Sequence, residues 1–282
     1  MELSVSSWSL SKLGCQSIEE IFIAAKRNGF TNMEMDLDDN YYVFFDYRSL
    51  SEEEVYAHFA EVKKLADKHG VTINQTHIPY AVFPTYLDDS YFELVKKGIA
   101  ATSALGAKYA VIHPFPFPLY KKRDFWVQER AFSLKWFKRL IPCLEQYGVV
   151  CCLENIYDWD NSEIRHTGFS NAKNLAELAQ ELGDNFGTCL DTGHYHLYGG
   201  TQEQAIREFG KTLKVLHIHD CYGIKDDHTI PMLGSIDWSN FVPTLREVGY
   251  EGVLNMELKP YPYMESDIGF AFAKEIMKSL IK

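Results

Sequence analysis

The sequence lacks any long apolar run. None of its apolar stretches approaches the ~20 residues that a membrane-spanning helix needs. The first residues also lack the basic start and the apolar core of a secretory signal peptide. We therefore expect a cytoplasmic protein that has no membrane partner.

Paired cysteine motifs are absent as well. The six cysteines form no Cys-x-x-Cys pair. Three of them, Cys151, Cys152 and Cys189, lie inside apolar runs, where cysteine behaves as a small apolar residue. Disulfides are rare in the cytosol, so the sequence predicts reduced thiols.

Positive charge is scarce. The chain has 28 Lys and Arg against 39 Asp and Glu, which gives a net charge of -11. Nonspecific nucleic-acid binding depends on clustered Lys and Arg. The charge balance therefore argues against nucleic acid as a partner, without excluding a local basic groove. The chain also has no dedicated glycine-rich phosphate cradle, so it gives no support for a phosphorylated substrate.

No linker, composition break or low-complexity segment interrupts the chain, so residues 1–282 are expected to form one domain. Short apolar runs alternate with longer amphipathic segments throughout. Strands are expected at residues 2–7, 33–37, 71–78, 109–112, 149–153, 187–191, 214–219 and 252–258. Helices are expected between them, including one over 125–147 that is kinked at Pro142, and residues 159–169 are expected to form a loop.

Strict alternation of eight strands with eight helices implies parallel strands joined by crossover helices. The length fits a single (β/α)8 TIM barrel, which typically needs about 250 residues. An open, doubly wound sheet would concentrate its site at one switch point. Here metal-type residues recur at many strand ends, which favours the closed barrel.

The C-terminal ends of six consecutive strands carry histidine or acidic residues. These residues are His77, His113, Glu154, Asp191, His217 and Glu257, and the loops after two of the strands add His194, Asp226 and His228. Strand ends converge on one mouth of a barrel, and buried carboxylates are costly unless they are paired or bound to a metal. The pattern therefore predicts a cation site. A lone histidine is more often a hydrogen-bonded rim residue, and a salt bridge is the main alternative for each carboxylate.

The chain resembles the xylose-isomerase-like barrel superfamily, which holds sugar isomerases, ketose epimerases, inosose dehydratases and endonuclease-IV-type DNA repair enzymes. The matching pieces are Leu153-Glu154-Asn155, Leu190-Asp191-Thr192-Gly193-His194, His217-Ile218-His219-Asp220, Asp226-Asp227-His228, Gly234-Ser235-Ile236-Asp237-Trp238 and Glu257. The resemblance covers nearly the whole chain.

This resemblance implies a divalent metal ion, with Mn, Zn, Co and Mg all suited to mixed oxygen and imidazole ligands. The implied ligands are Glu154, Asp191, His217 and Glu257. His217 is preferred over His219 because the ligand in this superfamily precedes an acidic residue by three positions, here Asp220. A second metal site or substrate contacts are implied at His77, His113, His194, Asp226 and His228.

The leading function that the resemblance implies is a sugar or polyol isomerase/epimerase with a small-molecule substrate. The metal would hold a carbonyl and a neighbouring hydroxyl and stabilise an enediolate. Glu154 and Glu257 would be the catalytic residues that move a proton on and off the adjacent carbon. Four aromatic residues near the mouth could wall the sugar, namely Trp8, Phe115, Phe117 and Trp159.

Three alternatives stay open: a metal-dependent DNA repair nuclease, an inosose-type polyol dehydratase, and a catalytically idle carbohydrate-binding barrel. The segment after Glu154 lacks the glycine-rich stretch of the nucleases, and Leu258-Lys259-Pro260 follows Glu257 where those enzymes have Thr-Pro. Near the mouth, Lys121-Lys122-Arg123 is the one basic cluster that could face DNA. The sequence leaves open the sugar, the number of metal ions and whether the chain forms a homo-oligomer.

Overall fold

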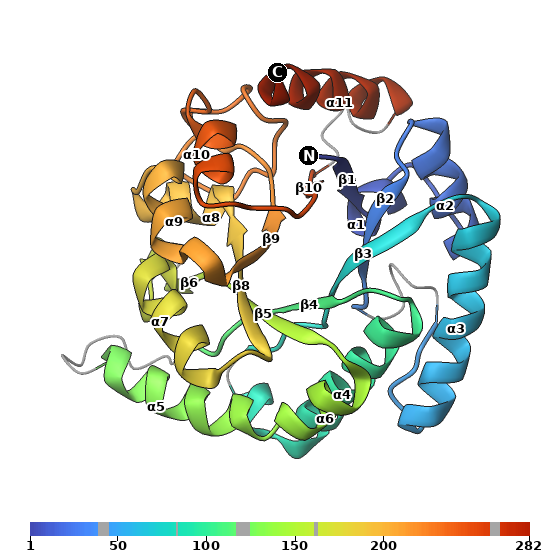
Figure 1. Ribbon diagram of the computed structural model, residues 1–282, viewed down its shortest axis with the longest axis vertical. Coiled ribbons are helices and arrows are strands. Elements are labelled where there is room, and N and C mark those ends of the chain that lie inside the picture. Colours follow the sequence, from blue (N-terminus) through green and yellow to red (C-terminus); the bar gives the residue numbers. More distant parts are fainter. Residues whose placement is uncertain (39–44, 83, 117–124, 161–162, 260–265) are drawn as a thin grey trace.

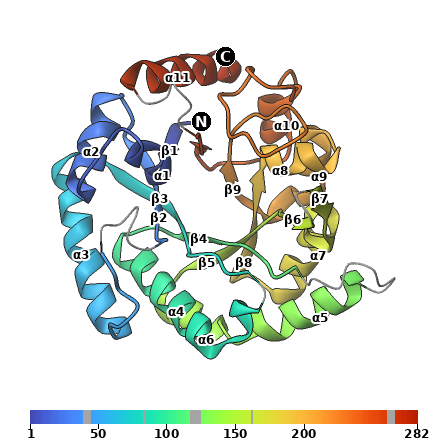
Figure 2. The ribbon, with the colours of Figure 1, turned by 180° about the vertical axis from the view of Figure 1, so that it is seen from behind.

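Eight parallel strands line the centre of the described residues, and helices surround them (Figure 1). The computed structural model describes residues 1–38, 45–82, 84–116, 125–160, 163–259 and 266–282. Figure 2 shows the same ring of helices from behind. The predicted TIM barrel is confirmed.

The barrel strands follow the order β10-β1-β2-β3-β4-β5-β8-β9. Their bounds are β1 Leu3–Ser6, β2 Asn32–Asp36, β3 Thr72–His77, β4 Tyr109–Ile112, β5 Val150–Glu154, β8 Phe186–Asp191, β9 Leu213–His217 and β10 Leu254–Met256. Two hydrogen bonds connect β9 to β10 just beyond the end of β9. The Ile218 N–H donates to the Asn255 carbonyl (2.8 Å), and the Glu257 N–H donates to the Ile218 carbonyl (3.1 Å). The sheet is therefore nearly closed, with its strand ends facing one mouth.

Helices connect successive strands and cover the outside of the barrel. Their bounds are α1 Ser7–Ser11, α2 Ile18–Arg27, α3 Glu52–Lys68, α4 Asp89–Ala104, α5 Phe125–Lys138, α6 Ile141–Tyr147, α7 Ala172–Leu182, α8 Thr192–Tyr198, α9 Gln202–Phe209, α10 Phe241–Glu247 and α11 Asp267–Ile281. Short 3-10 turns occur at Thr85–Leu87, Gly168–Ser170 and Gly210–Thr212. Among the described residues, no helix combines the length and the apolarity needed to cross a membrane.

Three of the predicted segments differ in the structure. The helix expected over 125–147 is divided into α5 and α6, and Pro142 lies in the first turn of α6, where its missing N–H is not needed. The expected loop after β5 contains an antiparallel hairpin, β6 Tyr157–Asp160 and β7 Glu163–His166. The strand expected over 252–258 is also shorter, since β10 contains only Leu254–Met256.

An apolar layer lies inside the barrel below the strand ends. It consists of Val111, Cys152, Cys189 and Val215, all nearly inaccessible to solvent. Side chains two residues apart on a strand point the same way. Cys152, Cys189 and Val215 therefore lie directly beneath Glu154, Asp191 and His217. Burial raises the pKa of the Cys189 thiol and keeps it protonated. The six cysteines are free, as predicted.

The loop after β9 is organised by the buried carboxylate of Asp220. Its Oδ1 accepts from the N–H groups of Cys221 (2.8 Å) and Ile236 (3.1 Å). Its Oδ2 accepts from the Met232 N–H (2.9 Å) and from Nε1–H of Trp238 (2.8 Å). One side chain thus fixes both ends of the segment that carries Asp226 and His228.

We expect Asp220→Asn to lower the free energy of unfolding by about 2–4 kcal/mol, since one acceptor oxygen becomes an NH2 group that faces two donors. Urea denaturation would measure the loss. Asp237→Asn is the matched control in the same loop, because Asp237 is exposed and its bond from the Ser239 N–H is local. Equal stabilities of the two variants would contradict the organising role of Asp220.

Candidate metal centre

Four side chains from strand ends meet at the mouth of the barrel. Glu154, Asp191 and His217 are the last residues of β5, β8 and β9, and Glu257 directly follows β10. Nδ1 of His217 lies 3.2 Å from Oε2 of Glu154 and 3.4 Å from Oε2 of Glu257. Ligand atoms of Asp191, His217 and Glu257 all lie within 4.8 Å of one another. The structure therefore brings the four predicted ligands together.

The spacing of these atoms fits a common cation. Nitrogen and oxygen ligands lie about 2.0–2.2 Å from a divalent ion such as zinc, so neighbouring ligand atoms are roughly 3.0–3.5 Å apart. Nδ1 of His217 and Oε2 of Glu154 are buried, and neither has a hydrogen-bond partner among the described residues. Nε2 of His217 faces Glu34 at 2.8 Å, which makes Nε2 the protonated nitrogen and leaves a lone pair on Nδ1. A lone pair that faces two carboxylates requires a proton or a cation between them.

A second cluster forms around the same glutamate. Nε2 of His77 and Nε2 of His113 lie 3.3 and 3.4 Å from Oε2 of Glu154, and 3.3 Å from each other. Both histidines follow the pattern of strand-end residues, on β3 and directly after β4. Glu154 is therefore shared between two groups of potential ligands.

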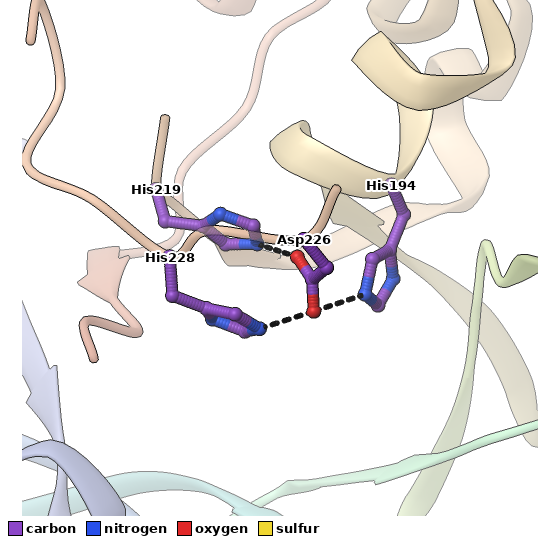
Figure 3. Close-up of side chains that lie close together, drawn as sticks. All are labelled: His194, His219, Asp226 and His228. Atoms are coloured by element: carbon purple, nitrogen blue, oxygen red, sulfur yellow. Dashed lines mark hydrogen bonds and ion pairs between the residues drawn. The ribbon is translucent and has the colours of Figure 1, made fainter. Parts of the chain in front are cut away.

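A third cluster contains His194, His219, Asp226 and His228 (Figure 3). Oδ2 of Asp226 lies 2.7 Å from Nε2 of His228 and 3.7 Å from Nε2 of His194. Oδ1 of Asp226 lies 3.8 Å from Nε2 of His219 and is buried without a hydrogen-bond partner among the described residues. His228 has a φ of 47°, an uncommon conformation outside glycine, and stacks on His219 with ring centroids 3.9 Å apart.

His194 lies in helix α8, which begins immediately after β8. Asp191 is the N-cap of this helix: its Oδ1 accepts from the His194 N–H at 2.7 Å, and its Oδ2 faces Nε2 of His219 at 2.9 Å. The expectation that His194 lies in a loop is wrong, because the carboxylate at the strand end starts a helix. Gly193 is required here, since a Cβ would lie 2.0 Å from the His219 ring.

The sequence prediction missed two buried residues below the centre, Glu34 on β2 and Gln75 on β3. Glu34 is 0% exposed and contacts His217 across the barrel interior. The signal was present in Asn32-Met33-Glu34-Met35-Asp36, where acidic and apolar residues alternate. In a barrel strand, this period places Glu34 and Asp36 on the same face.

A cavity of about 380 Å³ opens above the centre, in the size range of small-molecule sites. Of the four central residues, Glu154 and Glu257 line it. The other lining residues are Trp8, Asp36, Asp38, His77, Tyr80, His113, Ile156, Tyr157, His194, Asp226, His228 and Lys259.

Of the aromatic residues expected near the mouth, Trp8 lines the cavity and Phe115 does not. Phe115 is fully buried among Tyr86, Trp136 and Phe137, because the chain after β4 turns back onto the helices. Phe117 and the basic cluster 121–123 lie outside the described residues, and the side chain of Trp159 is not described. Tyr80 and Tyr157 line the cavity instead.

Protonated imidazoles balance the carboxylates when no metal is bound. Burial alone would raise the pKa of Glu154, but His217 and His113 hold that pKa well below its usual value. Burial alone would lower the pKa of His194, but Asp191 and Asp226 hold it well above its usual value. Since metal binding requires neutral imidazoles, a bound cation would displace these protons.

The chain belongs to the family of xylose isomerase-like TIM barrels, whose family model matches residues 22–277. This membership confirms the resemblance inferred from the sequence. Inosose isomerase of Bacillus licheniformis is 27% identical over 170 residues, which are 57% of this chain and 58% of that protein. An uncharacterized protein of Sinorhizobium fredii is 26% identical over 179 residues, 63% of this chain and 56% of that protein. The alignments thus span a little over half the length of these relatives.

Solved structures show the same fold over the whole chain. A D-tagatose 3-epimerase-like protein has a TM-score of 0.78 at 20% identity, and the match covers 100% of this chain and 97% of that one. An L-ribulose 3-epimerase has a TM-score of 0.76 at 17% identity, covering 100% and 95%. The IOLI protein, solved with a zinc atom, has a TM-score of 0.74 at 18% identity, covering 100% and 98%.

We expect the metal-free protein to lose stability between pH 6.5 and 9. Burial alone would lower the pKa of His77, but its close contact with the negative charge of Glu154 raises it to about 9. In this window the folded protein keeps a proton that the unfolded chain has lost, so the stabilisation present below pH 6.5 disappears as pH rises through 9. Burial raises the pKa of Asp36 to about 7. The folded protein therefore pays for ionising this buried carboxyl as pH rises to 7, which lowers the free energy of unfolding further.

Urea denaturation of chelator-treated protein at pH 6.5 and 9 would measure this difference, which should be on the order of 2–3 kcal/mol. His77→Gln should remove most of it, whereas the exposed His166→Gln control should leave it unchanged. A wild-type stability that is constant or rises over this range would contradict the prediction.

Proposed function

We propose that this protein is a divalent-metal-dependent sugar or polyol isomerase/epimerase. The observation that carries the proposal is that the four central residues differ in their access to the cavity. Asp191 and His217 are fully buried below the cavity, whereas Glu154 and Glu257 both line it. Two carboxylates that border both a cation site and a substrate cavity are suited to proton transfer next to a carbonyl. The inosose isomerase relative and the epimerase-like fold support the same class of reaction.

In this proposal, Glu154, Asp191, His217 and Glu257 hold the cation. When bound, a divalent ion would polarise a carbonyl and a neighbouring hydroxyl and so make the adjacent C–H acidic. Glu154 and Glu257 then remove a proton from that carbon and return it. Trp8 and Tyr157 border the cavity and help to exclude water from the reacting carbon. When only the central cation is bound, His194, which is 7% exposed and lines the cavity, donates a hydrogen bond to a substrate oxygen.

Glu154→Gln and Glu257→Gln should each reduce solvent deuterium incorporation at the substrate carbon by about 10²–10⁴-fold, the usual contribution of a general acid–base group. Candidate ketoses and inososes would be screened first with the wild-type protein by NMR in D2O. Glu251→Gln, an exposed position before β10, is the matched control. Bound metal would be quantified in each variant, because loss of the ion alone would also stop exchange. A metal-loaded variant that exchanges at the wild-type rate would refute the two-carboxylate scheme.

The two outer clusters favour a second candidate function, a nuclease that uses several metal ions. His77 and His113 share Glu154 with the central site, and the cluster around Asp226 adjoins Asp191 through His194 and His219. Linked cation sites can clamp the attacking and leaving oxygens of a phosphodiester. Against this candidate, Lys259 is the only Lys or Arg among the described residues that line the cavity.

We further propose that His194, Asp226 and His228, together with His219, can hold a second cation. Titration of metal-free protein with Zn²⁺ should then give at least two equivalents, and Asp226→Asn should remove one of them while leaving the first. Asp237→Asn, exposed in the same loop, should bind as wild type. A single equivalent in the wild-type protein would overturn the second site. Cleavage of abasic-site DNA, with no deuterium exchange on any ketose or inosose, would favour the nuclease.

A further inference from the structure

The carboxylate of Glu34 contacts a proposed metal ligand from the opposite side of the barrel. Glu34 lies in the middle of β2, and His217 ends β9 (Figure 1). Strands β10 and β1 lie between β2 and β9 in the sheet, so the contact crosses the barrel interior. Both side chains are 0–1% exposed, and Glu34 does not line the cavity among the described residues. Glu34 can therefore reach His217 without touching a substrate.

The hydrogen bonds of Glu34 select one form of the His217 ring. Oε2 of Glu34 accepts from Nε2–H of His217 at 2.8 Å and from Nε2–H of Gln75. An ionised carboxylate has no proton to donate, and His217 and Gln75 together hold the pKa of Glu34 below its usual value despite its burial, so the ring nitrogen that faces Oε2 must carry the hydrogen. Nδ1 is thus the nitrogen with a free lone pair, and it points toward Glu154 and Glu257. A histidine that binds a metal through one nitrogen is commonly held in this way by a carboxylate at the other.

A purely structural role explains Glu34 poorly. Burying a carboxylate in a barrel interior is expensive, and well-packed apolar residues often serve stability as well or better. This chain fills the neighbouring layer with Val111, Cys152, Cys189 and Val215. Oε1 of Glu34 has no hydrogen-bond partner among the described residues, so half of the carboxylate contributes no such bond to stability. The half that is satisfied is the half that orients His217.

We propose that Glu34 is a positioning residue that fixes the orientation and tautomer of His217, so that Nδ1 is ready to bind the catalytic cation. This inference rests on the proposed metal site, and it adds a residue that neither binds the cation nor contacts the substrate. Its predicted effect is on cation affinity first, and on catalysis only through that affinity.

The test compares three full-length variants stripped of metal with a chelator. Glu34→Gln keeps an acceptor oxygen of the same shape but removes the charge, and Glu34→Met removes the acceptor altogether. Gln75→Met is the matched control, because Gln75 donates to the same oxygen of Glu34, and its hydrogen bonds in the described part of the chain do not include one to the His217 ring. Calorimetric titration with Mn²⁺ gives the dissociation constant of each protein, and thermal unfolding without metal gives its stability.

We expect Glu34→Gln to weaken Mn²⁺ binding about 10-fold and Glu34→Met up to about 100-fold, the range found when such outer carboxylates are lost. Gln75→Met should change the dissociation constant less than about threefold, even if its thermal stability falls as much as that of Glu34→Gln. A dissociation constant of Glu34→Gln within about threefold of wild type would overturn the proposal. So would equal losses of affinity in Glu34→Gln and Gln75→Met, which would point to a structural role alone.

Nitrogen-15 NMR of the histidine rings provides a second measurement that stability does not affect. In the Zn²⁺-loaded wild-type protein, His217 should show the tautomer with a proton on Nε2, and Glu34→Met should show a weaker or mixed signal. A His217 signal that is identical in both proteins would also overturn the proposal. If the wild-type protein binds neither Mn²⁺ nor Zn²⁺, the proposed metal site itself fails, which separates that outcome from failure of the role of Glu34.

Discussion

The mouth of this barrel depends on the balance between crowded carboxylates and the positive charge that must accompany them. Glu154, Asp191, Asp226 and Glu257 converge at the ends of the barrel strands, and Glu34 lies just below them inside the barrel. No such group of buried carboxylates is stable without compensation. The compensation comes from imidazole side chains that lie between the carboxylates, each within a few ångströms of a carboxylate oxygen. Each imidazole can carry a proton or, when neutral, present a lone pair to a cation.

The rest of the fold holds these groups in place against their mutual repulsion. The apolar layer below the centre keeps water out of the barrel interior and fixes the depth of the site. Asp191 joins the site to the helix that follows it, since the same carboxylate caps α8 and faces His219. Asp220 does the equivalent for the loop that carries Asp226 and His228. Buried carboxylates thus hold the elements that carry the site residues in place. This explains how a site formed from several loops can be rigid.

The strand-end residues were predictable from the sequence because each follows a short apolar run that reads as a buried strand. Asp191 and His194 could therefore be identified as candidate site residues. The helix α8, which begins after Asp191 and contains His194, could not be predicted, since seven residues starting with Thr-Gly give a weak helical pattern. Glu34 was missed for a different reason. It lies inside its strand, and an alternating acidic residue in a strand normally indicates a face exposed to solvent. Only the closure of the barrel turns that face inward.

Other differences have equally local causes. The hairpin β6–β7 pairs two polar segments whose composition is that of a loop, and pairing between segments is not encoded in the periodicity of either one. Phe115 is an aromatic residue of the kind that often lines a substrate site, but its position depends on the path of the chain after β4. The aromatic cluster of Tyr86, Trp136 and Phe137 buries it on the outside of the barrel. A residue that follows a barrel strand in the sequence can thus belong to the hydrophobic core and not to the mouth of the barrel.

The number of cations that the mouth accepts follows from the same charge balance. The five carboxylates carry five negative charges, and one divalent ion neutralises two of them, which leaves three. With a single ion, the remaining charge favours the protonated form of His194, since Asp191 and Asp226 raise the pKa of this histidine well above its usual value. Protonated imidazoles at the cavity wall are hydrogen-bond donors suited to the hydroxyl and carbonyl oxygens of a polyol. With further ions, the same nitrogens become ligands and lose the ability to donate. The protonation state of His194 therefore distinguishes a one-metal sugar enzyme from a multi-metal phosphodiesterase within the same set of residues.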